Sequence, residues 1–186
     1  MIDYSKIRVL ILGKTGTGKT FLLKKIMKKV TVKRFVVFDL NEEYNEQYKN
    51  DTIIFYDLKS FISFYNTYKK EEFCFIIRFK DEEEIETLLN LLTTQKKLIL
   101  IIDEASYFFQ KNSKALQKIL RFGRHNNIGF IAVSRRVFEL SKELRALIYT
   151  IISFKQTEQT DLKQLEFLGL TNLNALKQYE YKKVDL

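Results

Sequence analysis

The chain has 186 residues, of which 46% are hydrophobic, so it is long enough to form one domain with a substantial core. It carries a formal net charge of +9 and contains one cysteine and no proline. This composition excludes an intrachain disulfide and a proline-rich linker, and no apolar run approaches the ~20 residues of a membrane-spanning helix. We therefore expect a single domain, residues 1–186, without a membrane span.

Short apolar runs alternate along the chain with segments of helical periodicity. In chain order, we predict strands at residues 7–12, 34–40, 52–56, 97–102, 128–133, 148–154 and 179–184, with a further apolar run at 73–79. Between them we predict helices at residues 19–30, 58–65, 81–92, 113–122, 141–147 and 160–168, whereas 41–48 fits either a helix or a loop. This alternation predicts an α/β fold with a mostly parallel sheet and helices on both faces.

Positive charge is concentrated in two stretches of the chain, residues 24–34 and 111–145. Solvated helix faces are the ordinary explanation of such charge. In the second stretch, however, basic residues far outnumber acidic ones, and a basic stripe is also the footprint of nucleic-acid binding. The sequence therefore predicts an anionic partner, with nucleic acid as the favoured class.

The segment from Gly13 to Thr20, here called the P-loop, fits the pattern G-x-x-x-x-G-K-[ST] between a predicted strand and a predicted helix. Glycines let the backbone wrap around phosphates, and the following helix presents its N-terminus to their charge. We expect Lys19 to contact the β- and γ-phosphates of ATP and the Thr20 hydroxyl to bind Mg²⁺. The predicted phosphate-binding residues are Gly13, Lys14, Thr15, Gly16, Thr17, Gly18, Lys19 and Thr20.

An acidic pair, Asp103 and Glu104, follows the apolar strand at residues 97–102. In P-loop ATPases an acidic residue at this place holds Mg²⁺ or its waters, and we assign that role to Asp103. Glu104 is then placed to orient or activate the water that attacks the γ-phosphate. A group that directs water favours an ATPase over a small-molecule kinase, which excludes water. The kinase and a scaffold that binds ATP without hydrolysis are the remote alternatives.

Three further segments follow the acidic pair in the order 121–136, 140–145 and 151–154. They contain an Arg-His pair before a strand, a polar strand end and a final Ile-Ser-Phe strand. Together with the P-loop and the acidic pair, they resemble the FtsK–HerA superfamily of DNA-pumping ATPases over residues 7–167. The resemblance implies a three-layer αβα, RecA-like P-loop NTPase fold, a homo-oligomeric ring that we expect to be a hexamer, and translocation of double-stranded DNA.

Within this superfamily, a chain that is nearly all motor core is most similar to the genome-packaging ATPases of tailless icosahedral DNA viruses with an internal membrane. This similarity implies packaging into a preformed capsid, capsid or portal-vertex proteins as partners, and a location in the host cytoplasm or with the virion. Residues 38–44 are also similar to a segment of HerA-type translocases, so a cellular or plasmid DNA translocase is one alternative. A Zot-like phage assembly ATPase is another, although that group usually carries a membrane span.

The resemblance also implies further catalytic residues. Arg124 occupies the place of an arginine finger that acts on the nucleotide of a neighbouring subunit, with Arg121 as the alternative. The superfamily usually has a glutamine that senses γ-phosphate at the end of the fourth core strand, where this chain has Arg135 after Ser134. Either Ser134 senses the phosphate, or Arg135 contacts it directly, or the alignment is displaced by one residue. We expect the single histidine, His125, to be structural, packing or hydrogen-bonding under the adjacent strand.

Overall fold

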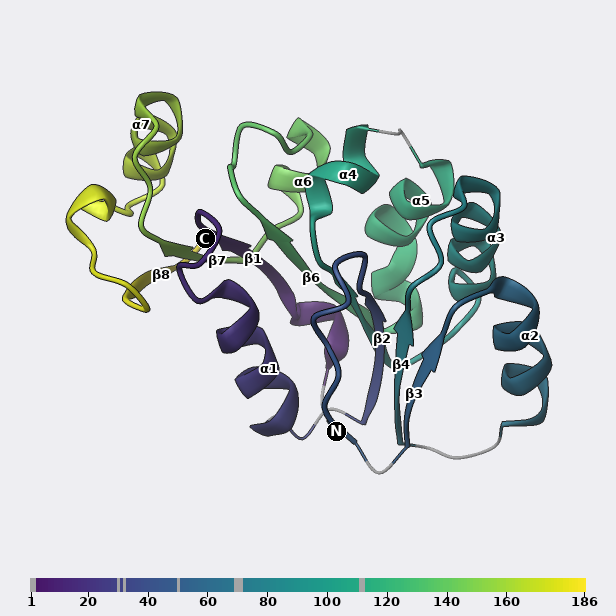
Figure 1. Cartoon of the computed structure of the whole chain (residues 1–186). Coiled ribbons are helices and arrows are strands. Elements are labelled where there is room, and N and C mark those ends of the chain that lie inside the picture. The colour runs from purple at the N-terminus through teal and green to yellow at the C-terminus, as the bar shows by residue number, and fades with distance from the viewer. Residues whose placement is uncertain (1–2, 30, 32, 50, 69–71, 111–112) are drawn as a thin grey trace.

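The computed structural model describes residues 3–29, 31, 33–49, 51–68, 72–110 and 113–186, and these form an eight-stranded sheet with helices on both faces (Figure 1). The strands are β1 (Arg8–Leu12), β2 (Arg34–Phe38), β3 (Thr52–Phe55), β4 (Phe73–Ile77), β5 (Leu98–Ile102), β6 (Ile128–Ser134), β7 (Thr150–Phe154) and β8 (Tyr181–Asp185). The helices are α1 (Lys19–Lys29), α2 (Leu58–Thr67), α3 (Glu82–Leu92), α4 (Ala105–Gln110), α5 (Lys114–Phe122), α6 (Lys142–Ala146) and α7 (Gln159–Phe167), with 3-10 turns η1 (Tyr4–Lys6), η2 (Gly123–Asn126) and η3 (Leu173–Ala175). Val30, the last residue of a predicted helix, and Lys111, the first of the second basic stretch, lie outside the described residues.

The order of the strands across the sheet is β3-β4-β2-β5-β6-β1-β7-β8. Neighbours from β3 to β7 are parallel, and β8 pairs antiparallel with β7 at the edge. The predicted α/β fold with a mostly parallel sheet is therefore confirmed. Because β1, β2, β5 and β6 are parallel, their carboxyl ends meet at one edge of the sheet, where ligands of such folds bind.

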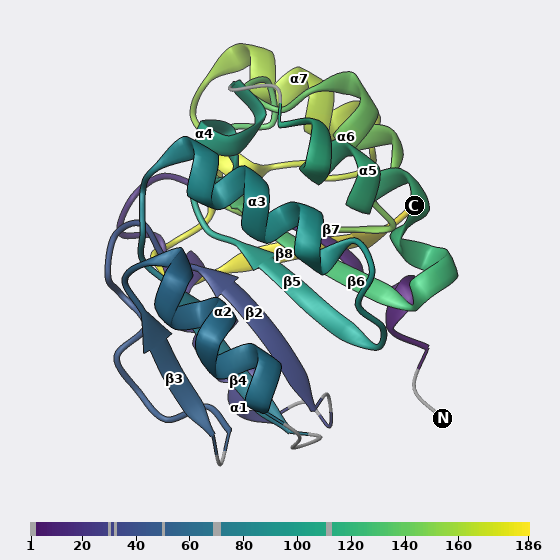
Figure 2. The same ribbon diagram turned by 90° about the vertical axis from the view of Figure 1, so that its right-hand side faces the viewer.

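The central strands are continuous apolar runs because the sheet is covered on both faces. Every residue of β4 and β5 is buried, whereas the edge strand β8 is exposed at alternate residues. One face packs against α2, α3, α5, α6 and α7, and Figure 2 shows α2, α3 and α5 lying side by side over it. The other face carries α1, whose Leu23 and Met27 are buried against the sheet.

The connection between β2 and β3 completes the cover of the α1 face. It is a loop rather than a helix, which decides the open question for residues 41–48. Tyr44 and Tyr48 of this loop are buried in the same apolar cluster as α1. The loop is therefore part of the core, and Tyr44 is carried to the carboxyl edge of the sheet.

Short polar side chains cap several helices at the expected residues. Asp81 accepts a hydrogen bond from the Glu84 N–H at the start of α3, and Ser113 accepts one from the Leu116 N–H at the start of α5. No pattern in the sequence predicted α4, which spans only 6 residues. A helix of that length is too short for a helical period to stand out from the apolar strand before it.

Burial of Cys74 in β4 gives a test of the sheet. Burial raises the pKa of its thiol to about 12, and the thiolate is the form that reacts with disulfide reagents. We expect the native protein to be unreactive towards Ellman's reagent at neutral pH and the protein in denaturant to release one equivalent of thionitrobenzoate, measured by absorbance. Rapid reaction of the native protein would contradict the buried position of β4.

Candidate nucleotide-binding site

The P-loop joins β1 to α1 at the carboxyl edge of the sheet, and its backbone depends on glycine. Gly16 and Gly18 have φ angles of 78° and 110°, a region that favours glycine. At Gly18 a side chain would also meet the ring of Tyr179, with its Cβ only 2.6 Å from Cδ1. Replacement of Gly18 would thus strain the backbone and displace a neighbour.

Hydrogen bonds within the P-loop hold Lys19 over it. The Lys19 ammonium donates to the Lys14 carbonyl oxygen at 3.0 Å, and the Thr17 hydroxyl donates to the same oxygen at 2.7 Å. Burial lowers the pKa of Lys19, while the negative charges of Asp103 and Glu104 oppose that shift. A bound polyphosphate would supply further negative charge to this ammonium, which is the arrangement that phosphate binding needs.

The acidic pair has two different environments. Asp103 is buried, and its carboxylate accepts hydrogen bonds from the Tyr44 hydroxyl at 2.8 Å and from the Glu104 N–H at 2.9 Å. Burial raises the pKa of Asp103 to about 6, although both hydrogen bonds oppose the shift. Glu104 is more exposed, and its carboxylate lies 3.5 Å from Asn41 Nδ2 and 3.4 Å from Arg135 Nη2. Asp103 is thus held rigidly below the site, and Glu104 faces it.

The backbone of Glu104 is strained. Its φ angle of 55° lies in the left-handed region, which non-glycine residues rarely adopt. Such strain persists only where the surrounding structure enforces it, and it gathers at functional sites. Here the turn gives the consecutive acids different surroundings, because Asp103 is buried and Glu104 is more exposed.

A cavity of about 330 Å³, here called the nucleotide cavity, joins these elements. It is lined by Thr15, Gly16, Gly18, Lys19, Thr20, Phe21, Asn41, Glu43, Asp103, Glu104, Arg135 and Tyr179. The structure therefore brings most of the predicted phosphate-binding residues together with both predicted acids. The volume lies within the usual range of small-ligand sites, about 300–1,000 Å³.

The residues present fit a Mg²⁺ ion that enters with a nucleotide. Thr20 and Asp103 both line the nucleotide cavity and supply a hydroxyl and a carboxylate. Among the described residues, no group of three or more His, Cys, Asp and Glu side chains could hold a metal by itself. Mg²⁺ usually keeps waters and binds through one or two protein oxygens plus substrate phosphates, so the donor set suits this ion.

At the end of β6, the side chains of Ser134 and Arg135 lie in different surroundings. Ser134 is buried, its hydroxyl donates to the Arg136 carbonyl oxygen at 3.2 Å, and its own carbonyl oxygen accepts from the Gly13 N–H at 3.3 Å. Arg135 instead lines the nucleotide cavity beside Glu104. Arg136 turns the other way and donates to buried Asp161 at 2.7 Å. Of the two predicted sensor residues, only Arg135 reaches the cavity.

Arg124 lies in η2, before β6 begins. It is therefore at the amino ends of the parallel strands, whereas the P-loop is at their carboxyl ends. The length of β6, 7 residues, separates the two edges by about 20 Å. Arg124 therefore does not reach the nucleotide cavity of its own chain, and its predicted role requires a neighbouring subunit. His125 is exposed, so the expectation that it packs under the adjacent strand is wrong.

A buried ion pair that the sequence pattern did not predict supports the site. Arg78, just after β4, donates through Nε to Asp39 at 3.0 Å, and both side chains are almost fully buried. The Asp39 carboxylate also accepts from the N–H groups of Glu43 and Tyr44. These bonds hold the loop so that the Tyr44 hydroxyl reaches Asp103. The available signal was a lone arginine directly after a fully apolar strand.

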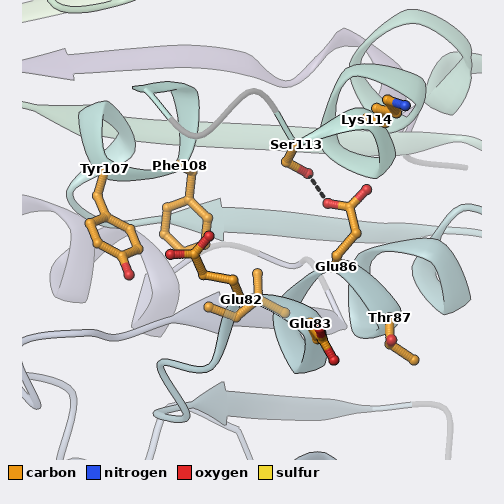
Figure 3. Close-up of a pocket in the computed structure, with 9 residues that line it drawn as sticks. Glu82, Glu83, Glu86, Thr87, Tyr107, Phe108, Ser113 and Lys114 are labelled. Atoms are coloured by element: carbon orange, nitrogen blue, oxygen red, sulfur yellow. Dashed lines mark hydrogen bonds between the residues drawn. The ribbon is translucent and has the colours of Figure 1, made fainter.

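A second cavity, of about 450 Å³, lies between α3, α4 and α5 (Figure 3). Its lining includes Glu82, Glu83 and Glu86, whose negative charge would repel phosphates. Figure 3 shows the Ser113 hydroxyl directed at Glu86, which also accepts from the Ala115 N–H at 2.8 Å. Glu86 thus supports the start of α5, and the charge of this cavity argues against nucleotide binding.

Comparisons with known proteins agree with this geometry. The family model described as "Poxvirus A32 protein" matches residues 2–178. The DNA-packaging ATPase B204 from Sulfolobus Turreted Icosahedral Virus is 25% identical with a TM-score of 0.70, covering 99% of this chain and 94% of that one. The genome packaging NTPase B204 from Sulfolobus turreted icosahedral virus 2, in complex with AMPPCP, is 22% identical with a TM-score of 0.76, covering 97% and 93%.

A more distant similarity is to the N-terminal domain of zonular occludens toxin from Neisseria meningitidis. It is 16% identical with a TM-score of 0.52, covering 83% of this chain and 80% of that one. No match was found among curated protein sequences. The solved structures confirm the P-loop NTPase fold that the sequence predicts.

The contact between Tyr44 and Asp103 yields a prediction about metal affinity. Tyr44→Phe keeps the buried ring and removes the hydroxyl that orients the Asp103 carboxylate. Because such supporting bonds change metal affinity by about 10- to 100-fold, we expect half-saturation by Mg²⁺ to need at least ~10-fold more metal. Mn²⁺ accepts the same oxygen ligands as Mg²⁺, so its binding in the presence of a non-hydrolysable ATP analogue, followed by electron paramagnetic resonance, should show the same loss.

Tyr48→Phe is the matched control for that variant. Within the described part of the chain, the Tyr48 hydroxyl is buried without a hydrogen-bond partner, and its ring packs beside Tyr44 with centroids 6.1 Å apart. Its removal should leave metal affinity unchanged. Equal metal affinity in both variants would contradict the role of Tyr44.

Proposed function

The chain belongs to the Poxvirus A32 protein family and is a P-loop ATPase, and from this premise we propose that it moves double-stranded DNA into a preformed viral capsid. The observation that carries the proposal is the nucleotide cavity, in which the P-loop faces Asp103 and Glu104. The described relative of 25% identity is a DNA-packaging ATPase, and this chain spans nearly its whole length. The net charge of +9 suits a polyanionic substrate.

In the proposed reaction, the P-loop amides and Lys19 hold the phosphates of ATP. Thr20 and Asp103 would hold Mg²⁺, which would neutralise phosphate charge when bound. Glu104 orients a water molecule towards the γ-phosphorus and accepts its proton as the new P–O bond forms. The bond to the oxygen that bridges the β- and γ-phosphates breaks, and ADP and phosphate leave.

Arg135 is the proposed γ-phosphate sensor. Its guanidinium lies 3.4 Å from Glu104, and the Arg135 side chain is about half exposed in the cavity. A γ-phosphate would compete with the Glu104 carboxylate for this guanidinium. Binding of ATP would then free Glu104 to act on water, and this exchange would link the state of the nucleotide to the loop after β6.

We also propose a ring of identical subunits, a hexamer, with the Arg124 finger completing the site of a neighbour. The finger adds positive charge where the transition state spreads negative charge. Capsid or portal-vertex proteins are the proposed further partners, and the host cytoplasm or the virion the proposed location. None of the helices in the described ranges has the length and hydrophobicity that a membrane-spanning helix needs.

A HerA-like cellular or plasmid translocase is the second candidate, because residues 39–44 build the Asp39 and Tyr44 contacts at the site. It would run the same chemistry on the same class of substrate. A Zot-like assembly ATPase and a small-molecule kinase are more remote candidates.

Hydrolysis of ATP with and without long double-stranded DNA tests the proposed motor. We expect DNA of any sequence to stimulate turnover, and the stimulation to fade as salt rises. Glu104→Gln should still bind ATP and lose about 100-fold or more in turnover, since general bases contribute about 10²–10⁴. Turnover that does not respond to DNA would contradict the proposed motor, and ATP binding without turnover would favour the scaffold. A fully active Glu104→Gln variant would show that Glu104 is not the base.

Mixed rings test the trans role of Arg124. Subunits with Arg124→Ala keep the P-loop, and subunits with Lys19→Ala keep the finger, so mixing two inactive variants should restore part of the turnover. A second mixture, of Arg121→Ala with Lys19→Ala, tests the alternative finger, because Arg121 is an exposed arginine just ahead in α5. If analytical ultracentrifugation shows intact rings and the mixture of Arg124→Ala with Lys19→Ala recovers no turnover, Arg124 is not the finger.

A further inference from the structure

The chain returns to the P-loop near its C-terminal end. The segment between η3 and β8, residues 176–180, lies beside the start of α1 and is yellow in Figure 1. The Tyr179 N–H donates to the Thr17 carbonyl oxygen at 3.2 Å, and Gln178 Nε2 donates to the Gly16 carbonyl oxygen at 3.2 Å. These two bonds attach the segment to the P-loop and determine where the Tyr179 ring lies.

The Tyr179 ring forms an aromatic pair with Phe21, the residue that follows the P-loop. Their centroids are 6.2 Å apart, with the planes inclined by 62°. Both side chains line the nucleotide cavity, yet Tyr179 is 60% and Phe21 65% exposed. Exposed aromatic surface that lines a binding cavity is available to contact a ligand.

The strand order places this aromatic pair at the far end of the cavity from the acids. Asp103 and Glu104 follow β5, which is separated from β1 by β6. Tyr179 precedes β8, which is separated from β1 by β7 on the other side. The P-loop after β1 lies between them. A nucleotide with its γ-phosphate at Glu104 and its other phosphates along the P-loop therefore extends its nucleoside towards Tyr179 and Phe21.

We propose that Tyr179, together with Phe21, is the nucleobase-binding surface of this protein. The inclined rings let a purine stack on one face while the other ring contacts its edge. Stacking on an aromatic face accepts any base, so this surface contributes affinity for the base with little choice between adenine and guanine. The inference rests on the ATP site proposed above and adds the residues that hold the base.

Isothermal titration with two ligands separates base binding from phosphate binding. The ligands are the ATP analogue AMPPNP and inorganic tripolyphosphate, which has no base. Stacking of a base on an aromatic side chain corresponds to about 5- to 150-fold in affinity. We expect Tyr179→Ala to lose AMPPNP affinity by this factor and keep tripolyphosphate affinity, and Tyr179→Phe to bind both ligands like the unchanged protein. Phe21→Ala should show a smaller loss that is also specific to AMPPNP.

Tyr181→Ala is the matched control. Tyr181 is 47% exposed in β8 and packs on Phe154 with centroids 5.4 Å apart, outside the nucleotide cavity. The Tyr181→Ala variant should bind AMPPNP with the affinity of the unsubstituted protein.

Equal loss of both ligands in Tyr179→Ala would show that the ring braces the P-loop, and would overturn the proposal. An unchanged AMPPNP affinity in Tyr179→Ala and Phe21→Ala would also overturn it, as would variants that lose only DNA affinity. If the unchanged protein bound neither ligand, the ATP site itself would be wrong, which is a distinct result.

Discussion

The buried ion pair between Arg78 and Asp39 is the constraint on which the site depends. A charge taken out of water must be paired, and removal of one partner of such a pair typically costs about 3–5 kcal/mol. The pair ties the ends of β4 and β2 together and satisfies two backbone N–H groups of the following loop. That loop then covers the α1 face of the sheet and carries the Tyr44 hydroxyl to Asp103. One ion pair thus connects the packing of the core to the proposed metal site.

Neighbouring residues at the carboxyl edge of the sheet have opposite environments. Asp103 is buried and Glu104 faces the cavity, while Ser134 supports the P-loop from behind and Arg135 faces Glu104. At the end of β5 the left-handed turn at Glu104 directs the two acids differently, and at the end of β6 the strand stops at Ser134. Each of these two strand ends therefore places a buried side chain, Asp103 or Ser134, directly before a more exposed one, Glu104 or Arg135.

The nucleotide cavity extends along the carboxyl ends of the strands, and the residues at its two ends have different proposed roles. The acids and Arg135 gather at one end and the aromatic pair at the other, with the P-loop between them. Arg124, at the opposite edge of the sheet, cannot complete this site within one chain. A motor whose hydrolysis needs a neighbour's arginine would couple turnover to assembly, which is what movement along DNA requires of a ring.

Local spacing in the sequence determined the P-loop, the acidic pair and the alternation of strands and helices. Each of these depends on residues within one turn or one strand, so their chemistry can be read without a fold. The tertiary structure alone decided that Arg78 pairs with Asp39, that Arg135 rather than Ser134 enters the cavity, and that Tyr179 lies on Gly18. It also placed His125 at the surface and formed the helix α4, which is too short for a helical period to be recognised in the sequence. These features depend on which strands become neighbours, and strand order arises from packing of the whole chain rather than from any local pattern.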